Sequence, residues 1–289
     1  MITDPLLTPR VLQQVLRKYH LPPLDRFGQH FLVDALVLQR IIAAADADPT
    51  LPIVEIGAGL GVLTRALAEA REAERPASSA PIIALEIDRR LIPLLTERLK
   101  AFPTVRIIHG DVLHLDPQTL DLETPYDVIG NIPYNITAKL LRHLLSWSPR
   151  PRRMTFLMDA AVARRVTARP PDMSVLAVSV HVYAEPMIVE MPIPPSAFLP
   201  EPKVASAIIR FNLRDEPRIP QKDRDAFFRL VRAGFSQKRK TLQNALRAFW
   251  RCAPAESATI LNGAGIDATR RAQTLTIEEW YTLLKSDGG

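Results

Sequence analysis

Short apolar runs alternate with helical patterns over residues 52–168, and this alternation constrains the fold more than any other feature of the chain. Each run is typical of a buried strand, and most runs are followed by apolar residues at helical spacing. The expected strands are 52–56, 82–86, 105–109, 126–130 and 154–158, and the expected helices are 60–69, 89–100, 138–147 and 160–168. Repeated strand–helix units imply a parallel sheet with helices on both faces, which is an α/β fold.

The sequence on either side of this stretch predicts further elements. Strands that close the sheet with antiparallel members are expected over 174–185, 187–192 and 205–212. Helices are expected over 8–19 and 34–45. The stretch 70–81 is polar, Ala-rich and bounded by proline, and we interpret it as an exposed insertion.

A change of pattern after Leu213 marks a domain boundary. Residues 214–221 are charged and punctuated by proline, and the sequence beyond them is helical and basic. We therefore predict an α/β domain over 1–213 and a small all-α domain over 214–289. The net charge of +6 and the pI near 9.7 favour a polyanionic partner, although composition does not separate nucleic acid from a membrane surface.

Composition also excludes several classes of protein. Cys252 is the only cysteine, which leaves no internal disulfide and no thiolate metal cluster. The histidines lack the spacing of a metal site. No apolar run approaches the length of a membrane span, and the first twenty residues lack the apolar core of a signal peptide. We expect a cytoplasmic protein that uses no metal and contacts no membrane.

A glycine-rich turn follows the first of the alternating strands. It reads Glu55-Ile56-Gly57-Ala58-Gly59-Leu60-Gly61, and glycines there let the backbone turn sharply and approach a ligand. The spacing is G-x-G-x-G, whereas a dinucleotide oxidoreductase carries G-x-G-x-x-G. Such a turn suits a nucleoside with an amino-acid tail better than a pyrophosphate. The alternative is a tight strand-to-helix turn without a ligand.

Two acids follow the next two strands. Glu86 ends the second strand, where its carboxylate can accept hydrogen bonds from both ribose hydroxyls of a nucleoside. Asp111 follows the third strand and can accept from an adenine amino group while Val112 supplies a backbone N–H. Taken alone, Asp111 is also typical of a helix cap. Because ligands bind at the carboxyl ends of parallel strands, these positions together predict a site for an adenosine without phosphates.

The tetrapeptide Asn131-Ile132-Pro133-Tyr134 ends the fourth strand and addresses a particular chemical problem, the alkylation of a planar amino nitrogen. The amide oxygen of Asn131 and the carbonyl of Ile132 can accept the two hydrogens of an adenine amino group, which frees its lone pair. Pro133 restricts the backbone, and Tyr134 offers a ring on which the base can stack. The alternative is a Pro-containing turn with a half-buried aromatic residue.

With these residues in place, the chain resembles the ribosomal RNA adenine N6,N6-dimethyltransferases, in particular the bacterial enzymes of the small subunit. The resemblance rests on the motifs above and on four further segments, which are Phe27-Gly28-Gln29-His30-Phe31-Leu32, Pro195 to Val204, Phe235 to Asn244, and Gly265-Ile266-Asp267. It covers essentially the whole chain and implies a class I methyltransferase fold with a small helical domain that binds RNA.

The resemblance also implies the cofactor, the substrate and the residues that serve them. The cofactor is S-adenosyl-L-methionine, and the substrate is the small-subunit rRNA within a pre-30S particle, dimethylated by a monomer on two adjacent adenines near its 3′ end. The residues implied to contact the cofactor are His30, Leu32, Gly57, Gly59, Glu86, Asp111, Val112 and Asn131. Phe198 is expected to sandwich the target base with Tyr134, although a core phenylalanine beneath the Pro-rich loop is the alternative. Lys203, Lys238, Arg239 and Lys240 are expected to contact RNA phosphates.

The sequence departs from the family pattern at two places. Asp159-Ala160-Ala161 replaces the usual Gln-Lys-Glu, and Met173 to Ala177 replaces a Tyr-Gly-Arg-Leu-Ser run. Both segments lie near the substrate side in the family, so they bear on how RNA docks. Three rival interpretations stay open, namely methylation of large-subunit rRNA, methylation of DNA adenine, and a non-catalytic ribosome-assembly or transcription factor that keeps the fold.

Overall fold

The computed structural model describes residues 4–75, 78, 80–122, 125–237 and 239–286. The chain divides into two compact units. The first comprises residues 1–163 and 187–213, and the second comprises residues 164–186 and 214–289. The predicted division after Leu213 coincides with one boundary between the units, whereas residues 164–186, which we assigned to the first domain, cluster with the second.

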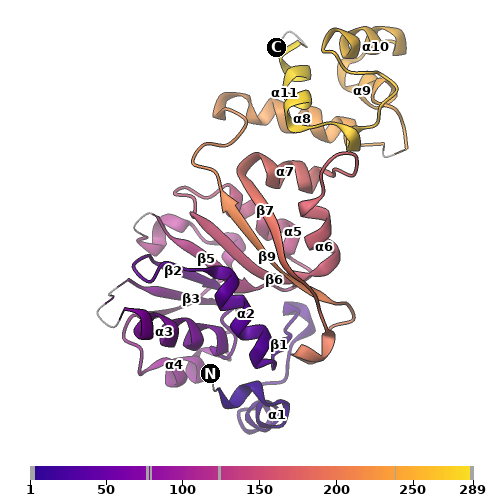
Figure 1. Cartoon of the computed structure of the whole chain (residues 1–289). Coiled ribbons are helices and arrows are strands. Elements are labelled where there is room, and N and C mark those ends of the chain that lie inside the picture. Colours follow the sequence, from indigo (N-terminus) through magenta and orange to yellow (C-terminus); the bar gives the residue numbers. More distant parts are fainter. Residues whose placement is uncertain (1–3, 76–77, 79, 123–124, 238, 287–289) are drawn as a thin grey trace. The chain divides into compact units, whose positions relative to one another are not determined.

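A seven-stranded sheet of the order β4-β3-β2-β5-β6-β9-β7 organises the α/β architecture (Figure 1). The strands are β2 (Ile53–Ile56), β3 (Ile82–Glu86), β4 (Val105–His109), β5 (Asp127–Asn131), β6 (Arg153–Asp159), β7 (Ala184–Ile193) and β9 (Ser206–Leu213). The pairs among β4, β3, β2, β5 and β6 are parallel, and β9 runs antiparallel to β6. The predicted α/β class and the parallel core of the sheet are therefore confirmed.

Helices of the first unit pack through apolar side chains on this sheet or, at the N-terminus, on the glycine turn that follows β2. They are α1 (Pro9–Lys18), α2 (Ala35–Ala45), α3 (Val62–Glu74), α4 (Ile92–Leu99) and α5 (Thr137–Leu145), and α6 (Ala160–Thr167) follows β6. Leu38 and Ile41 of α2 share one buried cluster with Leu67 of α3 and Leu157 of β6. A short ribbon of β1 (Phe31–Leu32) and β8 (Phe198–Leu199) pairs Leu32 with Phe198.

The predicted insertion at 70–81 is wrong in its first part. Helix α3 continues to Glu74, and Arg71 on its last turn is only 5% exposed. The Arg71 guanidinium donates through Nη1 to the carbonyl of Ala80 and through Nη2 to that of Leu51, and these two hydrogen bonds offset part of the cost of burying a charged group. Residues 76, 77 and 79 of this stretch lie outside the described residues.

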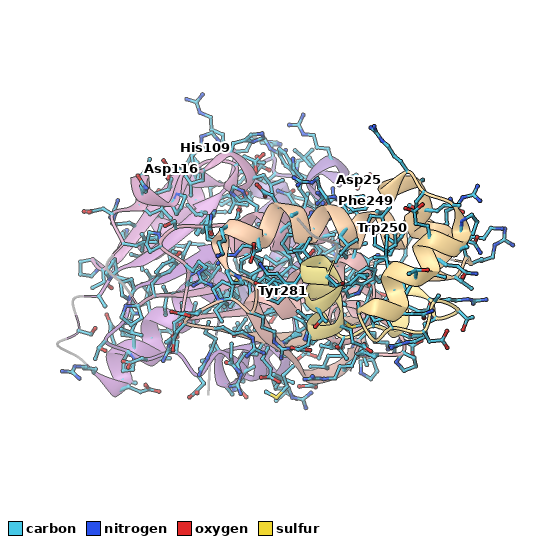
Figure 2. The ribbon with its side chains drawn as sticks, turned by 90° about the horizontal axis from the view of Figure 1, so that it is seen from above. Asp25, His109, Asp116, Phe249, Trp250 and Tyr281 are labelled. Atoms are coloured by element: carbon cyan, nitrogen blue, oxygen red, sulfur yellow. The ribbon has the colours of Figure 1, made fainter. Side chains whose placement is uncertain are left out.

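The second unit is helical and has its own core. It contains α7 (Val175–Tyr183), α8 (Arg224–Phe235), α9 (Leu242–Trp250), α10 (Pro254–Gly263) and α11 (Ile277–Ser286). Trp280 and Phe227 are completely buried in its apolar cluster. The Tyr281 hydroxyl donates to Asp223 at 2.7 Å. The rings of Phe249 and Trp250 meet edge to face, and Figure 2 labels both of them together with Tyr281.

Helix α7 overturns the prediction of a strand over 174–185. Its residues from Leu176 to Val182 are all buried, so the sequence shows a continuous apolar run without helical periodicity. Ser174 begins the helix, because its side chain accepts from the N–H of Ala177 at 3.1 Å. Within the described ranges, no helix has the length and apolar character needed to cross a lipid bilayer.

Candidate active site

A cavity opens at the carboxyl edge of the parallel strands in the first unit. It is bounded by the turn after β2, the end of β3, the loop after β5 and the loop before β1. The residues that line it are Leu6, Leu12, Phe27 to Leu32, Ile41, Glu55, Gly57 to Leu60, Val62, Leu63, Glu86, Ile87 and Asn131 to Tyr134. The structure therefore brings the glycine turn, the predicted ribose acid and the Asn131–Tyr134 tetrapeptide to one place.

The glycine turn depends on left-handed backbone conformations. Gly57, Gly59 and Gly61 have φ angles of 76°, 57° and 77°. The N–H groups of Gly57 and Ala58 both donate to the carbonyl of Leu85, at 2.9 and 3.0 Å, which ties the turn to β3. Since residues with a Cβ rarely adopt such angles, the glycines are required by the course of the backbone at the cavity wall.

Glu86 lies where the sequence predicts an acid for a nucleoside. Its Oε2 accepts from the N–H of Gly59 and its Oε1 accepts from the N–H of Asp88, each at 2.7 Å. The residue is 4% exposed, and this burial raises the pKa of Glu86 even though the two backbone N–H groups act in the opposite direction. A carboxylate fixed in this way keeps further lone pairs for a ligand in the cavity.

Glu55 also lines the cavity, although no role for it was predicted from the sequence. It is 1% exposed, and burial raises the pKa of Glu55 to about 7. The nearby Thr64 hydroxyl limits the rise of this pKa. Among the described residues, however, neither Glu55 Oε2 nor Thr64 Oγ1 has a hydrogen-bond partner of normal geometry. The sequence does carry a signal for a functional residue here, because Glu55 is an acid that stands two residues before Gly57.

Asn131 is oriented by a backbone carbonyl from another part of the chain. Its Nδ2 donates to the carbonyl of His30 at 3.0 Å, and no described residue donates to its Oδ1. The amide oxygen thus remains available as an acceptor at the end of β5. Pro133 belongs to the same wall, and Gly28 (φ 59°) faces it so closely that an added Cβ would lie 3.2 Å from the Pro133 Cβ.

Tyr134 is held on both its ring and its hydroxyl. Its hydroxyl pairs with Ser206 Oγ, and its ring stacks on His30 with the centroids 5.8 Å apart and the planes at 24°. Burial raises the pKa of Tyr134, so the phenol stays neutral. His30 Nδ1 lies 2.7 Å from the carbonyl of Pro200 and donates to it, because a carbonyl oxygen can only accept. The structure therefore gives His30 a supporting contact to Tyr134 that the sequence did not predict.

Three predicted residues lie outside the wall of this cavity. The Asp111 carboxylate accepts from the N–H of Leu113 at 2.9 Å and lies 3.0 Å from His114 Nδ1, so it caps a short helical turn (Val112–His114). Val112 is buried beside it. Phe198 is 2% exposed in the core cluster that contains Leu32, so it takes the buried alternative that the sequence left open and is not an exposed wall for a base. Leu32 itself lines the cavity.

None of the described residues predicted to bind RNA lines the cavity. Lys203, Arg239 and Lys240 are exposed, and Lys238 lies outside the described residues. Arg239 and Lys240 belong to the second unit. In the described part of the chain, no cluster of three or more His, Cys, Asp or Glu side chains is arranged to hold a metal ion.

Comparison with known proteins gives a consistent result. The sequence model of the family described as "Ribosomal RNA adenine dimethylase" matches residues 24–285. The "Ribosomal RNA small subunit methyltransferase A" of Dehalococcoides mccartyi strain BAV1 is 38% identical over 272 residues, covering 94% of this chain and 90% of the relative. The protein of the same name from Moorella thermoacetica is 37% identical over 295 residues, covering 98% and 99%.

Two solved structures are similar over most of their length. The 23S rRNA methyltransferase ErmE is 28% identical with a TM-score of 0.69, and the match covers 89% of this chain and 98% of ErmE. A dimethyladenosine transferase from Plasmodium falciparum is 22% identical with a TM-score of 0.72, covering 88% and 96%, and this likeness concerns the fold alone.

Proposed function

The chain belongs to the ribosomal RNA adenine dimethylase family, and on that premise we propose that it dimethylates N6 of two adjacent adenines near the 3′ end of small-subunit rRNA. Relatives that are 37–38% identical over 94–98% of the chain carry the name of a small-subunit methyltransferase. The observation that carries the proposal is the free amide oxygen of Asn131 beside the glycine turn and Glu86. The proposed substrate form is rRNA within a pre-30S particle, and the proposed working form is a monomer.

The proposed methyl donor is S-adenosyl-L-methionine, which supplies an electrophilic methyl group and its own leaving group. The cavity fits such a donor because a glycine turn, a buried carboxylate and an apolar wall meet there. Glu86 would accept from the ribose hydroxyls, and the turn at Gly57 and Gly59 would lie against the amino-acid tail. Asp111 and Val112 are proposed at the adenine, and His30 and Leu32 at the mouth of the site.

Asn131 and Tyr134 are proposed to act on the target adenine. Asn131 Oδ1 and the carbonyl of Ile132 would accept hydrogens from the amino group, which localises its lone pair for attack on the methyl carbon. The donor would supply the methyl carbon and leave as a thioether with the C–S bonding electrons, and the amino nitrogen would lose its proton to solvent. Tyr134 is fixed by Ser206 and His30, so it offers the base a rigid ring. A sandwich that also uses Phe198 would require movement of that buried ring.

Phosphate contacts are proposed for the second unit, where Arg239 and Lys240 are exposed beside Lys238 in sequence. A second candidate function is methylation of large-subunit rRNA, which the likeness to ErmE favours. The identity to ErmE is lower, at 28%, than the identity to the small-subunit relatives. The small-subunit substrate is therefore the better supported of the two.

One experiment tests both the substrate and the chemistry. The protein is incubated with S-adenosylmethionine carrying a labelled methyl group and with small subunits, large subunits or naked DNA, and modified bases are mapped. We expect dimethyladenosine at two adjacent positions of small-subunit rRNA only. Asn131→Ala should lower kcat by about 10²–10³-fold, the typical cost of removing one such polar contact, with a much smaller change in cofactor Kd. Asn262→Ala, an exposed position of α10, serves as the control. Label on large subunits or DNA alone would refute the proposal.

A further inference from the structure

Two side chains in the cavity wall come from a part of the chain that the family match does not cover. The match begins at residue 24, whereas Leu6 and Leu12 line the cavity. Both lie in residues 4–21, here called the N-terminal segment, which contains the turn Pro5–Leu7 and helix α1. The site is therefore completed by residues that no motif predicts.

The N-terminal segment packs directly against the glycine turn. Leu6 is 2% exposed and Leu12 is 1% exposed, and both belong to one apolar cluster with Leu60 of that turn. Leu91 and Leu94 at the start of α4 belong to the same cluster. The N-terminal segment thus packs against the glycine turn, whose backbone approaches the ligand.

Arg98 of α4 joins the N-terminal segment to the turn. Its Nε donates to the carbonyl of Leu60 at 2.7 Å, and its Nη2 donates to Asp4 Oδ2 at 2.5 Å. The other oxygen, Asp4 Oδ1, accepts from the N–H of Leu6 at 2.9 Å. One planar guanidinium therefore spans both partners, a geometry that the ammonium of lysine does not reproduce.

An ion pair at the protein surface contributes little to stability, but the pair of Asp4 and Arg98 is largely buried. The Asp4 side chain is 2% exposed and that of Arg98 is 17% exposed. Lys100, two residues further, offers a contrast, because it pairs with Glu97 while both side chains are about two-thirds exposed, at 68% and 66%. Removing one partner of an enclosed pair leaves an uncompensated charge, so the docked segment depends on Arg98.

We infer that the N-terminal segment is part of the binding site for S-adenosylmethionine and that Arg98 is the positioning residue that holds it there. The inference rests on the cofactor given in the proposed function. Docking of the N-terminal segment and binding of the cofactor are then linked. When the docked fraction falls by a given factor, the apparent Kd of the cofactor rises by that factor. By reciprocity, a bound cofactor shifts the docking equilibrium toward the docked segment by the ratio of its Kd values for the undocked and the docked chain.

The test measures both sides of this linkage without RNA. Kd for S-adenosylhomocysteine is measured by calorimetry for the full chain, Arg98→Met, Asp4→Asn and the double variant. Trypsin cleavage at the exposed Arg10, Arg17 and Lys18 is followed with and without that ligand. Lys100→Met removes a cation near the same end of α4 and serves as the control.

If Arg98→Met lowers the docked fraction to about one in ten, Kd should rise about tenfold. Ligand at about ten times that Kd should then slow cleavage of this variant about tenfold. Asp4→Asn should weaken binding in the same direction, and the double variant should be less than additive. Equal Kd values for the variant and the unchanged chain would overturn the inference, as would weaker binding without ligand protection. Failure to methylate small-subunit rRNA with these couplings intact would count only against the proposed function.

Discussion

Replacing Gly130 with alanine should separate two strands directly beneath the Asn131 side chain. Gly130 of β5 pairs in parallel with Ile56 of β2. A Cβ added at Gly130 would lie 2.5 Å from the carbonyl oxygen of Ile56 and 3.1 Å from Ile132 Cδ1. Carbon–oxygen contacts between strands normally lie at about 3.3–3.6 Å, so the strands would have to move apart by roughly 0.8 Å at this point. The oxygen belongs to backbone and has no rotamer through which to escape.

The cost of Gly130→Ala has two components. Forcing a group into a packed interior typically costs about 1–3 kcal/mol of folding stability. Asn131 is the next residue and would shift with the strand, and a misplacement near 1 Å at a reacting centre costs on the order of 10²-fold in rate. That factor corresponds to about 2.7 kcal/mol of barrier. We therefore expect a stable but slow enzyme.

Urea unfolding and methyl transfer to small subunits measure the two components of this loss separately. The matched control is Gly110→Ala, which follows β4 at the same edge of the sheet and whose added Cβ would meet no atom within 4 Å. The control should stay within about 0.5 kcal/mol of the unchanged chain. The contrary result is that Gly130→Ala unfolds at the same urea concentration as the unchanged chain and transfers methyl groups at a similar rate. That result would show that the close contact between Gly130 and Ile56 does not position Asn131.

Two further predictions concern pH and the division into units. The folded-state pKa of Glu55, about 7, lies above the ordinary value of 4.5, so the folded chain keeps a proton that the unfolded chain loses over this window. Stability should therefore fall as pH rises from about 4.5 to 7, by roughly 3 kcal/mol, and Glu55→Gln should flatten this decline in urea titrations at stepped pH. In the second unit, a Cβ at Gly234 would lie 2.3 Å from Trp280 Cη2, so Gly234→Ala should destabilise that unit by about 1–3 kcal/mol. Calorimetry should then show an earlier transition with unchanged affinity for S-adenosylhomocysteine, and a single shifted transition would argue against independent cores.

The sheet and the strand-end residues could be predicted because parallel strands put their carboxyl ends at one edge. Glu86 and Asn131 follow different strands, and knowledge of the topology was enough to bring them together. The helix over Val175–Tyr183 could not be predicted in the same way. Its apolar residues are continuous, because it is buried on all sides, and periodicity vanishes when every face is buried.

Side-chain direction and long-range contact set the limit of such prediction. Phe198 stands at the expected place in its motif, yet its ring turns into the core, because a motif fixes position along the chain but not rotamer. The periodicity of residues 8–19 predicts a helix, but it carries no information on what the apolar face covers. Leu6 and Leu12 reach the cavity because Arg98 holds their segment through Asp4, a partner 94 residues away in the sequence. Residues that complete a site through such contacts are found only by following the hydrogen bonds and packing outward from the cavity.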